Sequence, residues 1–292
     1  LTVYMMRSVT IEELEGFRDA LLELCLAVDL AEYDPIDLCG TGGDGKDTFN
    51  ISTLASFVTA GAGIHVTKHG NYGVSSKCGS SNVMEFLGIK FSNDADFLKK
   101  TIEEAGICVL HAPLFHPAMK NVAPIRRELA VKTFFNMLGP MVNPAFPKNQ
   151  MVGVFNLELA RMYGYLYQNT DKKFTILNAL DGYDEISLTG DTKTISNHTE
   201  AMLTPADFGV EKVSQQEITG GEDVAESAQI FMNILQGKGT NAQNNVVCAN
   251  AGVAIATVKG ITPKEGFEMA KESLLNGKGL AALKKLQDLS KN

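Results

Sequence analysis

The sequence predicts an α/β fold with a mostly parallel sheet flanked by helices. The first observation is a series of short, largely apolar segments, at 36–39, 63–67, 107–111, 151–155 and 173–178. Such segments are typical of parallel strands that are buried on both faces. The second is that helical segments separate them, at 53–62, 81–87, 94–105 and 157–168. This alternation is that of repeated βαβ units.

Further elements are expected on both sides of these units. Thr10 is expected to be the N-cap of a helix from Ile11 to Val28, and Glu13 would complete a capping box. Residues 192–204 alternate like two short strands. The final helices are expected at 222–236, 240–257, 263–276 and 280–289. Residues 112–149 interrupt the alternation with several prolines and apolar helical segments near 118–138.

Composition narrows the class of protein. The 292 residues carry a formal net charge of −8, which disfavours a general nucleic-acid or anionic-membrane surface. The five cysteines are scattered and form no C-x-x-C, so we interpret them as reduced thiols of a cytosolic protein. No apolar run has the length of a membrane span, and no signal peptide is recognised. Leu1 is not an initiator Met, so we expect the natural start to be missing.

The third observation is a glycine-rich loop between the first strand and the next helix. Gly40-Thr41-Gly42-Gly43-Asp44-Gly45 places four glycines within six positions. Glycines let a ligand approach the backbone N–H groups, and a helix N-terminus adds partial positive charge. Ser52 or Thr53 is expected to be the N-cap of that helix. The loop therefore predicts a phosphate site.

Two general phosphate motifs fit this loop poorly. The pattern G-x-G-x-x-G requires an acidic residue at the end of the next strand, but Lys68-His69-Gly70-Asn71 stands there. The pattern G-x-x-x-x-G-K requires Ser or Thr after Lys46, where this chain has Asp47. A plain surface turn without a ligand is the remaining alternative.

A second basic loop argues against the plain turn. Residues 68–82 leave the second strand and enter a helix, with Gly, Ser, Lys and Asn in both loops. In open α/β sheets ligands bind at the carboxyl ends of strands. We expect the two loops to bind one multiply phosphorylated substrate.

Several motifs together resemble those of the anthranilate phosphoribosyltransferase family. The motifs occur in the family's order and spacing, and the resemblance extends from near residue 5 to the C-terminus. They are Gly-Thr-Gly-Gly-Asp at 40–44, Asn-Ile-Ser-Thr at 50–53, Lys-His-Gly-Asn at 68–71, Ala-Pro-Ile-Arg-Arg-Glu-Leu at 123–129, Phe-Asn-Met-Leu-Gly-Pro at 135–140 with Asn143-Pro144, and Asp-Gly-Tyr-Asp-Glu at 181–185.

The resemblance implies two domains with a cleft between them. A small all-α domain would comprise residues 1–32 and about 118–145, with additional helices upstream in the family. Residues 33–117 and about 146–292 would form the α/β domain that binds the phosphoribosyl diphosphate.

The resemblance also implies an activity. The phosphoribosyl group of 5-phosphoribosyl 1-diphosphate would pass to the amino group of anthranilate, with release of pyrophosphate, as a step of tryptophan biosynthesis. The implied cofactor is Mg²⁺, and the implied assembly is a cytoplasmic homodimer without nucleic-acid or membrane partners. No strong catalytic base is required, because the amine is already nucleophilic.

Site residues follow from the matching positions. The implied metal ligands are Ser52, Asp184 and Glu185. The implied donor-binding residues are Gly40, Gly43, Asp44, Thr48, Asn50, Ile51, Ser52, Thr53, Lys68, His69, Gly70, Asn71, Tyr72, Gly73, Val74, Ser75, Ser76 and Ser80. The implied anthranilate-binding residues are Gly40, His69, Asn71, His116 and Arg126. Lys68 and Arg126 would act electrostatically.

Some of these residues also have a structural interpretation without a functional role. Adjacent acids such as Asp184 and Glu185 are usually solvated loop charges, and Arg126 could be part of a charge cluster that faces water. His111 is interpreted as structural. Tyr72 departs from the family pattern, in which an Arg commonly follows Lys-His-Gly-Asn, and the change would remove a positive charge near the substrates.

Two other functions remain open at this point. A nucleoside phosphorylase of the same fold would use free phosphate as nucleophile, but that family's glycine and lysine motifs are not seen. A nucleic-acid-binding relative without enzyme activity would need a basic patch, which the net charge of −8 disfavours.

Overall fold

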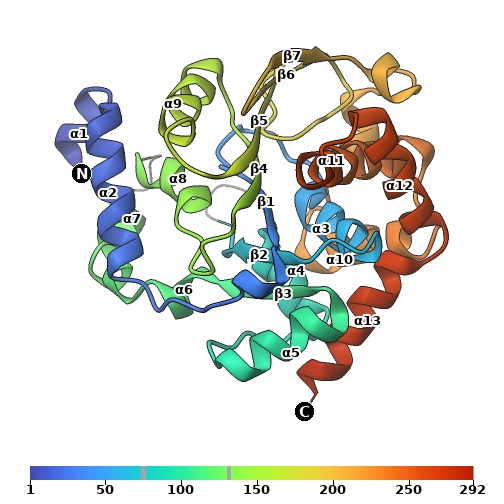
Figure 1. Cartoon of the computed structure of the whole chain (residues 1–292), viewed down its shortest axis with the longest axis horizontal. Coiled ribbons are helices and arrows are strands. Elements are labelled where there is room, and N and C mark those ends of the chain that lie inside the picture. The colour runs from blue at the N-terminus through green and yellow to red at the C-terminus, as the bar shows by residue number, and fades with distance from the viewer. Residues whose placement is uncertain (74–76, 130–132, 292) are drawn as a thin grey trace.

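The computed structural model describes residues 1–73, 77–129 and 133–291, and its centre is a seven-stranded sheet with helices on both faces (Figure 1). The strand order is β3-β2-β1-β4-β5-β6-β7. Strands β1 to β5 are parallel, whereas β6 and β7 are antiparallel additions at one edge. The predicted mostly parallel α/β sheet is confirmed. The strands are β1 Ile36–Gly40, β2 Val66–Gly70, β3 Ile107–His111, β4 Asn149–Gly153, β5 Lys173–Ala179, β6 Thr192–Ser196 and β7 Glu200–Leu203.

Two strand positions differ from the prediction because buried polar residues belong to the strands. The strand expected at 63–67 is Val66–Gly70, since Gly63 at φ 86° still forms the turn after the preceding helix. Lys68 therefore lies within β2, opposite Val109. The strand expected at 151–155 is Asn149–Gly153. The Asn149 amide donates to Asp34 Oδ1 at 2.9 Å, which satisfies a polar group inside the sheet.

One face of the sheet is covered by the helices that build the main core (Figure 1). At its centre lies α3, which is buried at nine of its eleven positions. Helices α11 and α13 both contact α3, and α12 packs along α11. The helices of this group are α3 Ile51–Gly61, α4 Ser80–Phe86, α10 Val224–Leu235, α11 Asn241–Lys259, α12 Pro263–Leu275 and α13 Lys278–Ser290.

The opposite face is covered by α9 and by the first helices of the chain (Figure 1). Leu14 of α2 and Phe134 share one buried cluster with Tyr163 of α9 and with Val152 and Ile176 of the sheet. The Phe17 and Phe134 ring centroids lie 4.4 Å apart. The helices of this side are α1 Thr2–Met6, α2 Ile11–Glu23, α7 Ala123–Leu129, α8 Phe135–Leu138 and α9 Leu157–Tyr167. Helices α5 Ala95–Ala105 and α6 Ala112–Phe115 flank β3 near the sheet edge.

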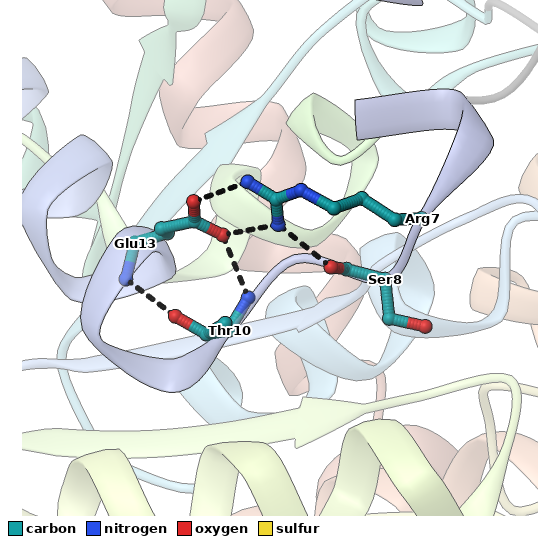
Figure 2. Close-up of polar contacts among 4 residues, drawn as sticks. All are labelled: Arg7, Ser8, Thr10 and Glu13. Carbon is teal, nitrogen blue, oxygen red and sulfur yellow. Dashed lines mark hydrogen bonds and ion pairs between the residues drawn. The ribbon is translucent and has the colours of Figure 1, made fainter. Parts of the chain in front are cut away.

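The start of α2 confirms the predicted capping box (Figure 2). The Glu13 backbone N–H donates to Thr10 Oγ1 at 3.3 Å, and the Thr10 N–H donates to Glu13 Oε2 at 3.0 Å. Figure 2 also shows the Arg7 guanidinium on the same carboxylate, at 2.8 Å from Oε2. This ion pair lowers the pKa of Glu13 to about 2. The acid of the capping box is therefore ionised at neutral pH.

The end of α2 differs from the prediction, which extended the helix to Val28. The helix ends at Glu23, and the backbone N–H groups that follow find partners in other segments. The Leu26 N–H donates to Phe115 O at 2.8 Å, and the Val28 N–H donates to Pro144 O at 3.0 Å. Leu26 is exposed, whereas Val28 and Leu30 are buried in a cluster with Leu98 and Leu110, so tertiary packing and not a continued helix accounts for these apolar residues.

Among the described residues no single helix is long and apolar enough to cross a membrane. One bent pair, α11 with α12 at 119°, passes that test by length and composition alone.

Candidate active site

The direction in which successive strands are added to the sheet changes at β1. β1 lies between β2 and β4, so the chain runs from β1 to β3 in one direction and resumes with β4 on the other side. Such a topological switch point is where ligands bind in open α/β sheets, at the carboxyl ends of the strands. Gly40 at the end of β1 and Gly153 at the end of β4 pair there.

Both glycines make room for Asp184. A Cβ on Gly40 would lie 2.2 Å from Asp184 Oδ2, and a Cβ on Gly153 would lie 1.6 Å from the Asp184 carbonyl oxygen. Neither distance is possible for a real side chain. The segment after β5 can therefore cross the strand ends only because both positions are glycine.

Asp184 and Glu185 form a buried acidic pair at this point. Asp184 is 7% exposed and Glu185 8%. The Gly42 N–H donates to Asp184 Oδ2 at 2.6 Å, and the Ser52 N–H at the start of α3 donates to Glu185 Oε1 at 3.2 Å. Burial raises the pKa of both carboxyls, and the negative charge of Glu185 raises the pKa of Asp184 further. These acids are not solvated loop charges.

The pair fits a divalent cation. No group of three or more His, Cys, Asp and Glu side chains suited to a metal is found in residues 1–73, 77–129 and 133–291. Mg²⁺, however, binds through one or two carboxylates together with substrate phosphates and water. Two buried carboxylates that repel each other, with the Ser52 hydroxyl beside them, are such a donor set. A cation there would offset the burial that raises the pKa of both carboxyls and the repulsion that raises the pKa of Asp184 further.

Lys68 brings a buried positive charge to the same place. It is 2% exposed, and its Nζ donates to Leu38 O at 2.6 Å and to Ser52 Oγ at 3.3 Å. Its charge lowers the pKa of Glu185 and so opposes the effect of burial. Ser52 is thus contacted from both sides, by the lysine at its hydroxyl and by the glutamate at its N–H.

The N-cap predicted for α3 was wrong. Asn50 is the N-cap, and Ser52 and Thr53 lie in the first turn. The reason is that Glu185, 133 residues further along the chain, accepts the free Ser52 N–H that a local cap would otherwise satisfy.

The glycine-rich loop has the conformation that its composition predicts. Gly42, Gly43 and Gly45 have φ values of 71°, 77° and 74°. Only glycine adopts this left-handed region without strain. At the end of the loop, Thr48 forms an isolated bridge with Thr219 of the C-terminal part. Lys46 lies 4.6 Å from the centroid of the Tyr183 ring, which links this loop to the Asp184 segment.

The second loop is closed at its base by Asn82, which sequence reasoning missed. Asn82 Oδ1 accepts the Gly73 N–H at 2.9 Å and the Gly79 N–H at 3.0 Å. A Cβ on Gly79 would lie 2.1 Å from Gly73 N, so the two ends touch. Asn50 Nδ2 donates to Cys78 O at 3.0 Å and connects the two loops. A local signal existed, since Asn at the third position of a helix that follows glycine can cap the preceding turn.

The predicted residues Val74, Ser75 and Ser76 lie outside the described residues. Ser80 begins α4, and its Oγ donates to Asn71 O at 3.3 Å.

Tyr72, the departure from the family pattern, is attached to the helix that follows the loop. Its hydroxyl lies 3.2 Å from Glu85 Oε1, and its ring meets the edge of His111 at a centroid distance of 4.8 Å. His111 in turn contacts Ser81 Oγ through Nδ1 at 2.9 Å and stacks on Phe91. His111 is therefore a structural residue, as predicted.

His69 and His116 form a buried ring pair, with centroids 5.3 Å apart. His69 Nδ1 lies 3.2 Å from Gly139 O and so acts as the donor. Burial, together with the neighbouring His116, lowers the pKa of His69 to about 3, so the ring is neutral. Its Nε2 has no hydrogen-bond partner in the described part of the chain. A neutral acceptor nitrogen therefore lies beside the pocket.

Arg126 of α7 is half-buried and lines the same pocket. Its Nη2 donates to Asn136 Oδ1 at 3.3 Å, and its Cζ lies 5.3 Å from the Phe135 ring centroid. Burial lowers the pKa of Arg126. The ion pairs of the described residues do not include it.

One pocket of about 620 Å³ collects these groups. Apolar residues such as Leu21, Met119 and Leu138 line it together with the polar ones. All predicted site residues that the structure describes line it: Gly40, Gly43, Asp44, Thr48, Asn50, Ile51, Ser52, Thr53, Lys68, His69, Gly70, Asn71, Tyr72, Gly73, Ser80, His116, Arg126, Asp184 and Glu185. The size and mixed lining are those of a small-molecule site.

The fold and this pocket define an α/β protein with a small-molecule site at the carboxyl ends of its strands. Residues 32–280 match the model of the "Glycosyl transferase family, a/b domain". Two relatives named anthranilate phosphoribosyltransferase come from Flavobacterium psychrophilum, 77% identical, and Flavobacterium johnsoniae, 74% identical. Each match covers 99% of this chain and 88% of the relative. The chain belongs to the anthranilate phosphoribosyltransferase family.

Solved structures agree with this assignment. Anthranilate phosphoribosyltransferase from Thermus thermophilus superposes with a TM-score of 0.92 at 31% identity, over 99% of this chain and 87% of that one. The enzyme from Saccharomyces cerevisiae, solved in complex with PRPP and Mg, superposes with a TM-score of 0.89 at 30% identity, over 97% of this chain and 80% of that one.

Proposed function

We propose that the protein transfers the phosphoribosyl group of 5-phosphoribosyl 1-diphosphate to the amino group of anthranilate and releases pyrophosphate. The observation that carries this proposal is the mixed lining of one pocket. The glycine loops, Lys68 and the acidic pair line it, and we call this set the donor end; Arg126 and apolar side chains from other elements line it too, and we call that set the acceptor end. A multiply charged donor fits the first set, and a flat aromatic carboxylate fits the second.

The donor end is suited to a diphosphate leaving group. Backbone N–H groups of the first loop and the Lys68 ammonium would stabilise the negative charge that develops as the ribose C1–O bond breaks. Ser52, Asp184 and Glu185 would hold Mg²⁺. When bound, this ion would neutralise part of the charge on the pyrophosphate. The yeast relative's complex with PRPP and Mg supports Mg²⁺ as the ion.

The acceptor end is suited to an aromatic carboxylate. Arg126 would bind the carboxylate, because a guanidinium fork matches its two oxygens. His69 would accept a hydrogen bond at the unpartnered Nε2, and His116 would pack beside the aromatic ring. A second yeast structure, in complex with 4-fluoroanthranilate, supports a benzoate of this kind as the ligand. Holding the amine near C1 supplies the remaining rate enhancement.

The test is an assay with the diphosphate donor, anthranilate and Mg²⁺, followed by the loss of anthranilate fluorescence. We expect turnover that requires all three components. Inosine or thymidine with free phosphate serves as the comparison, because a nucleoside phosphorylase would consume those instead. Turnover of the nucleosides alone would contradict the proposal.

The division into domains is also proposed. Residues 1–32 with about 118–145 would form the helical domain, and 33–117 with about 146–292 the α/β domain. The pocket supports this division, because Leu21 and Arg126 come from the first set and Lys68 and Asp184 from the second.

A cytoplasmic homodimer that binds neither nucleic acid nor membranes remains our prediction for the assembly. The net charge of −8 supports the absence of a nucleic-acid partner. Sedimentation velocity over a range of concentrations would measure the oligomeric state.

A further inference from the structure

We propose that Asn136 is a positioning residue that fixes the Arg126 guanidinium without neutralising its charge, and so sets the recognition of the acceptor carboxylate. This inference rests on the proposed function.

The Asn136 amide oxygen has two donors that define its position. It accepts the Arg126 Nη2–H at 3.3 Å and the Thr133 N–H at 3.2 Å. The Asn136 N–H donates back to Thr133 O at 3.0 Å. Because two N–H groups point at the same atom, the orientation of the amide is determined, and the oxygen faces the guanidinium.

The segment that carries Asn136 is anchored to the sheet. The carbonyl of Gly139 accepts His69 Nδ1–H at 3.2 Å. The carbonyls of Pro140 and Met137 accept hydrogen bonds from Gln150 of β4 and Tyr163 of α9. Three donors from three different elements therefore hold this short segment.

Arg126, in contrast, lies on the seven-residue helix α7, and within residues 1–73, 77–129 and 133–291 the partners of its side chain are Asn136 and the Phe135 ring. Both partners belong to α8. The position of the guanidinium relative to the pocket is therefore set by α8 and not by α7 alone.

An amide is the right chemistry for such an anchor. A guanidinium has five N–H donors, and the bond to Asn136 uses one of them, which leaves the others for a ligand. A carboxylate in the same position would accept the same two hydrogen bonds but would pair its charge with Arg126. The half-buried cation would then have an internal partner and would bind an external carboxylate less tightly.

The difference between an amide and a carboxylate at position 136 can be tested by substitution. Asn136→Asp keeps the shape and both acceptor bonds, so a purely structural role predicts normal kinetics. The positioning role predicts a KM for anthranilate raised by about tenfold or more, the loss expected when one charge-assisted bond is weakened. The KM for the diphosphate donor and the melting temperature should stay near the wild-type values. Asn136→Ala, which removes the anchor without adding charge, should raise the KM for anthranilate by a smaller factor.

Asn169→Asp is the matched control, because it adds the same charge at an exposed turn that does not line the pocket. It should leave both KM values unchanged. A normal KM for anthranilate in Asn136→Asp, or equal losses for both substrates, would overturn the inference. Failure of the proposed function is a separate result, because the wild-type protein itself would then not consume anthranilate.

Discussion

Gly153 lies against the backbone of Asp184 so closely that a Cβ would stand 1.6 Å from the Asp184 carbonyl oxygen. This contact lies at the switch point of the sheet and fixes where the acidic pair crosses the strand ends. Gly153→Ala should therefore displace Asp184 by about 1 Å or more. A misplacement of that size costs roughly a hundredfold in turnover.

The control for this prediction is Gly16→Ala. A Cβ on Gly16, in α2, would meet nothing within 4 Å, so the change should leave turnover intact. Helical alanine should also stabilise the protein by about 0.5–1 kcal/mol. Equal turnover in Gly153→Ala and wild type would show that the acidic pair is not placed by this contact.

The acidic pair should be required for activity and should lower the stability of the folded protein. The double change Asp184→Asn with Glu185→Gln should reduce turnover roughly a hundred- to thousandfold. A carboxyl whose pKa is raised by folding disfavours the folded state above that pKa, since its charged form is less stable when buried. Without Mg²⁺ at pH 8, the double variant should therefore melt no lower than the wild type. Addition of Mg²⁺ should raise the melting temperature of the wild type only. A variant that keeps Mg²⁺-dependent turnover would refute the assignment.

Substitution of Asn82 should raise the KM of the diphosphate donor and leave the KM of anthranilate unchanged. Asn82→Ala removes two hydrogen bonds that close the base of the second loop. Each contributes about 1 kcal/mol, so we expect the KM of the diphosphate donor to rise by about tenfold or more. Asn82→Asp retains an acceptor for both N–H groups and should recover most of the loss. Steady-state kinetics that vary each substrate in turn would measure both KM values. A raised KM for anthranilate with a normal KM for the donor would contradict this role of Asn82.

Arg126 should have the opposite selectivity. Arg126→Ala should raise the KM for anthranilate roughly ten- to hundredfold, because a charge-assisted hydrogen bond contributes about 1.5–3 kcal/mol. The KM for the donor should be nearly unchanged. Arg126→Lys should recover only part of the loss, since a point charge does not reproduce the fork. A variant impaired mainly for the donor would assign Arg126 to the phosphate end.

The buried His69 should make the free energy of unfolding decrease at acid pH. The pKa of His69 is about 3 in the folded protein against an ordinary value of 6.5, so between these values the unfolded chain binds the proton. The stability from the neutral ring is therefore complete above pH 6.5 and is lost progressively as the pH falls towards 3. His69→Asn cannot titrate but keeps a donor for Gly139. The free energy of unfolding in urea, measured from pH 4 to 8, should fall less steeply in this variant. Parallel profiles would contradict the assigned pKa.

Sequence reasoning predicts the parts of this molecule whose signals are local. The βαβ alternation, the capping box at Thr10 and the positive φ values of the glycine loop all depend on neighbouring residues. The strand at Val66–Gly70 was misplaced because Lys68 and His69 are polar, and only the tertiary structure buries them.

The site likewise has residues that the motifs predict and contacts that only the tertiary structure creates. The motifs named the residues that line the pocket, but the Glu185 carboxylate at the Ser52 N–H joins positions 133 residues apart. The roles of Gly153 and of Asn136, which stands in the motif at 135–140, were missed for the same reason, since the contacts that make them important come from other elements. A spacing rule contains no information about such pairs.

The burial of α3 determines how this scaffold can be altered. Its first turn contains Ser52, and nine of its eleven residues are buried, so the donor end cannot be redesigned without repacking the main core. Arg126 and Asn136 of the proposed acceptor end lie on two helices of seven and four residues. Directed evolution towards new aromatic amines should therefore accumulate its substitutions in α7 and α8, while the phosphoribosyl chemistry is inherited unchanged.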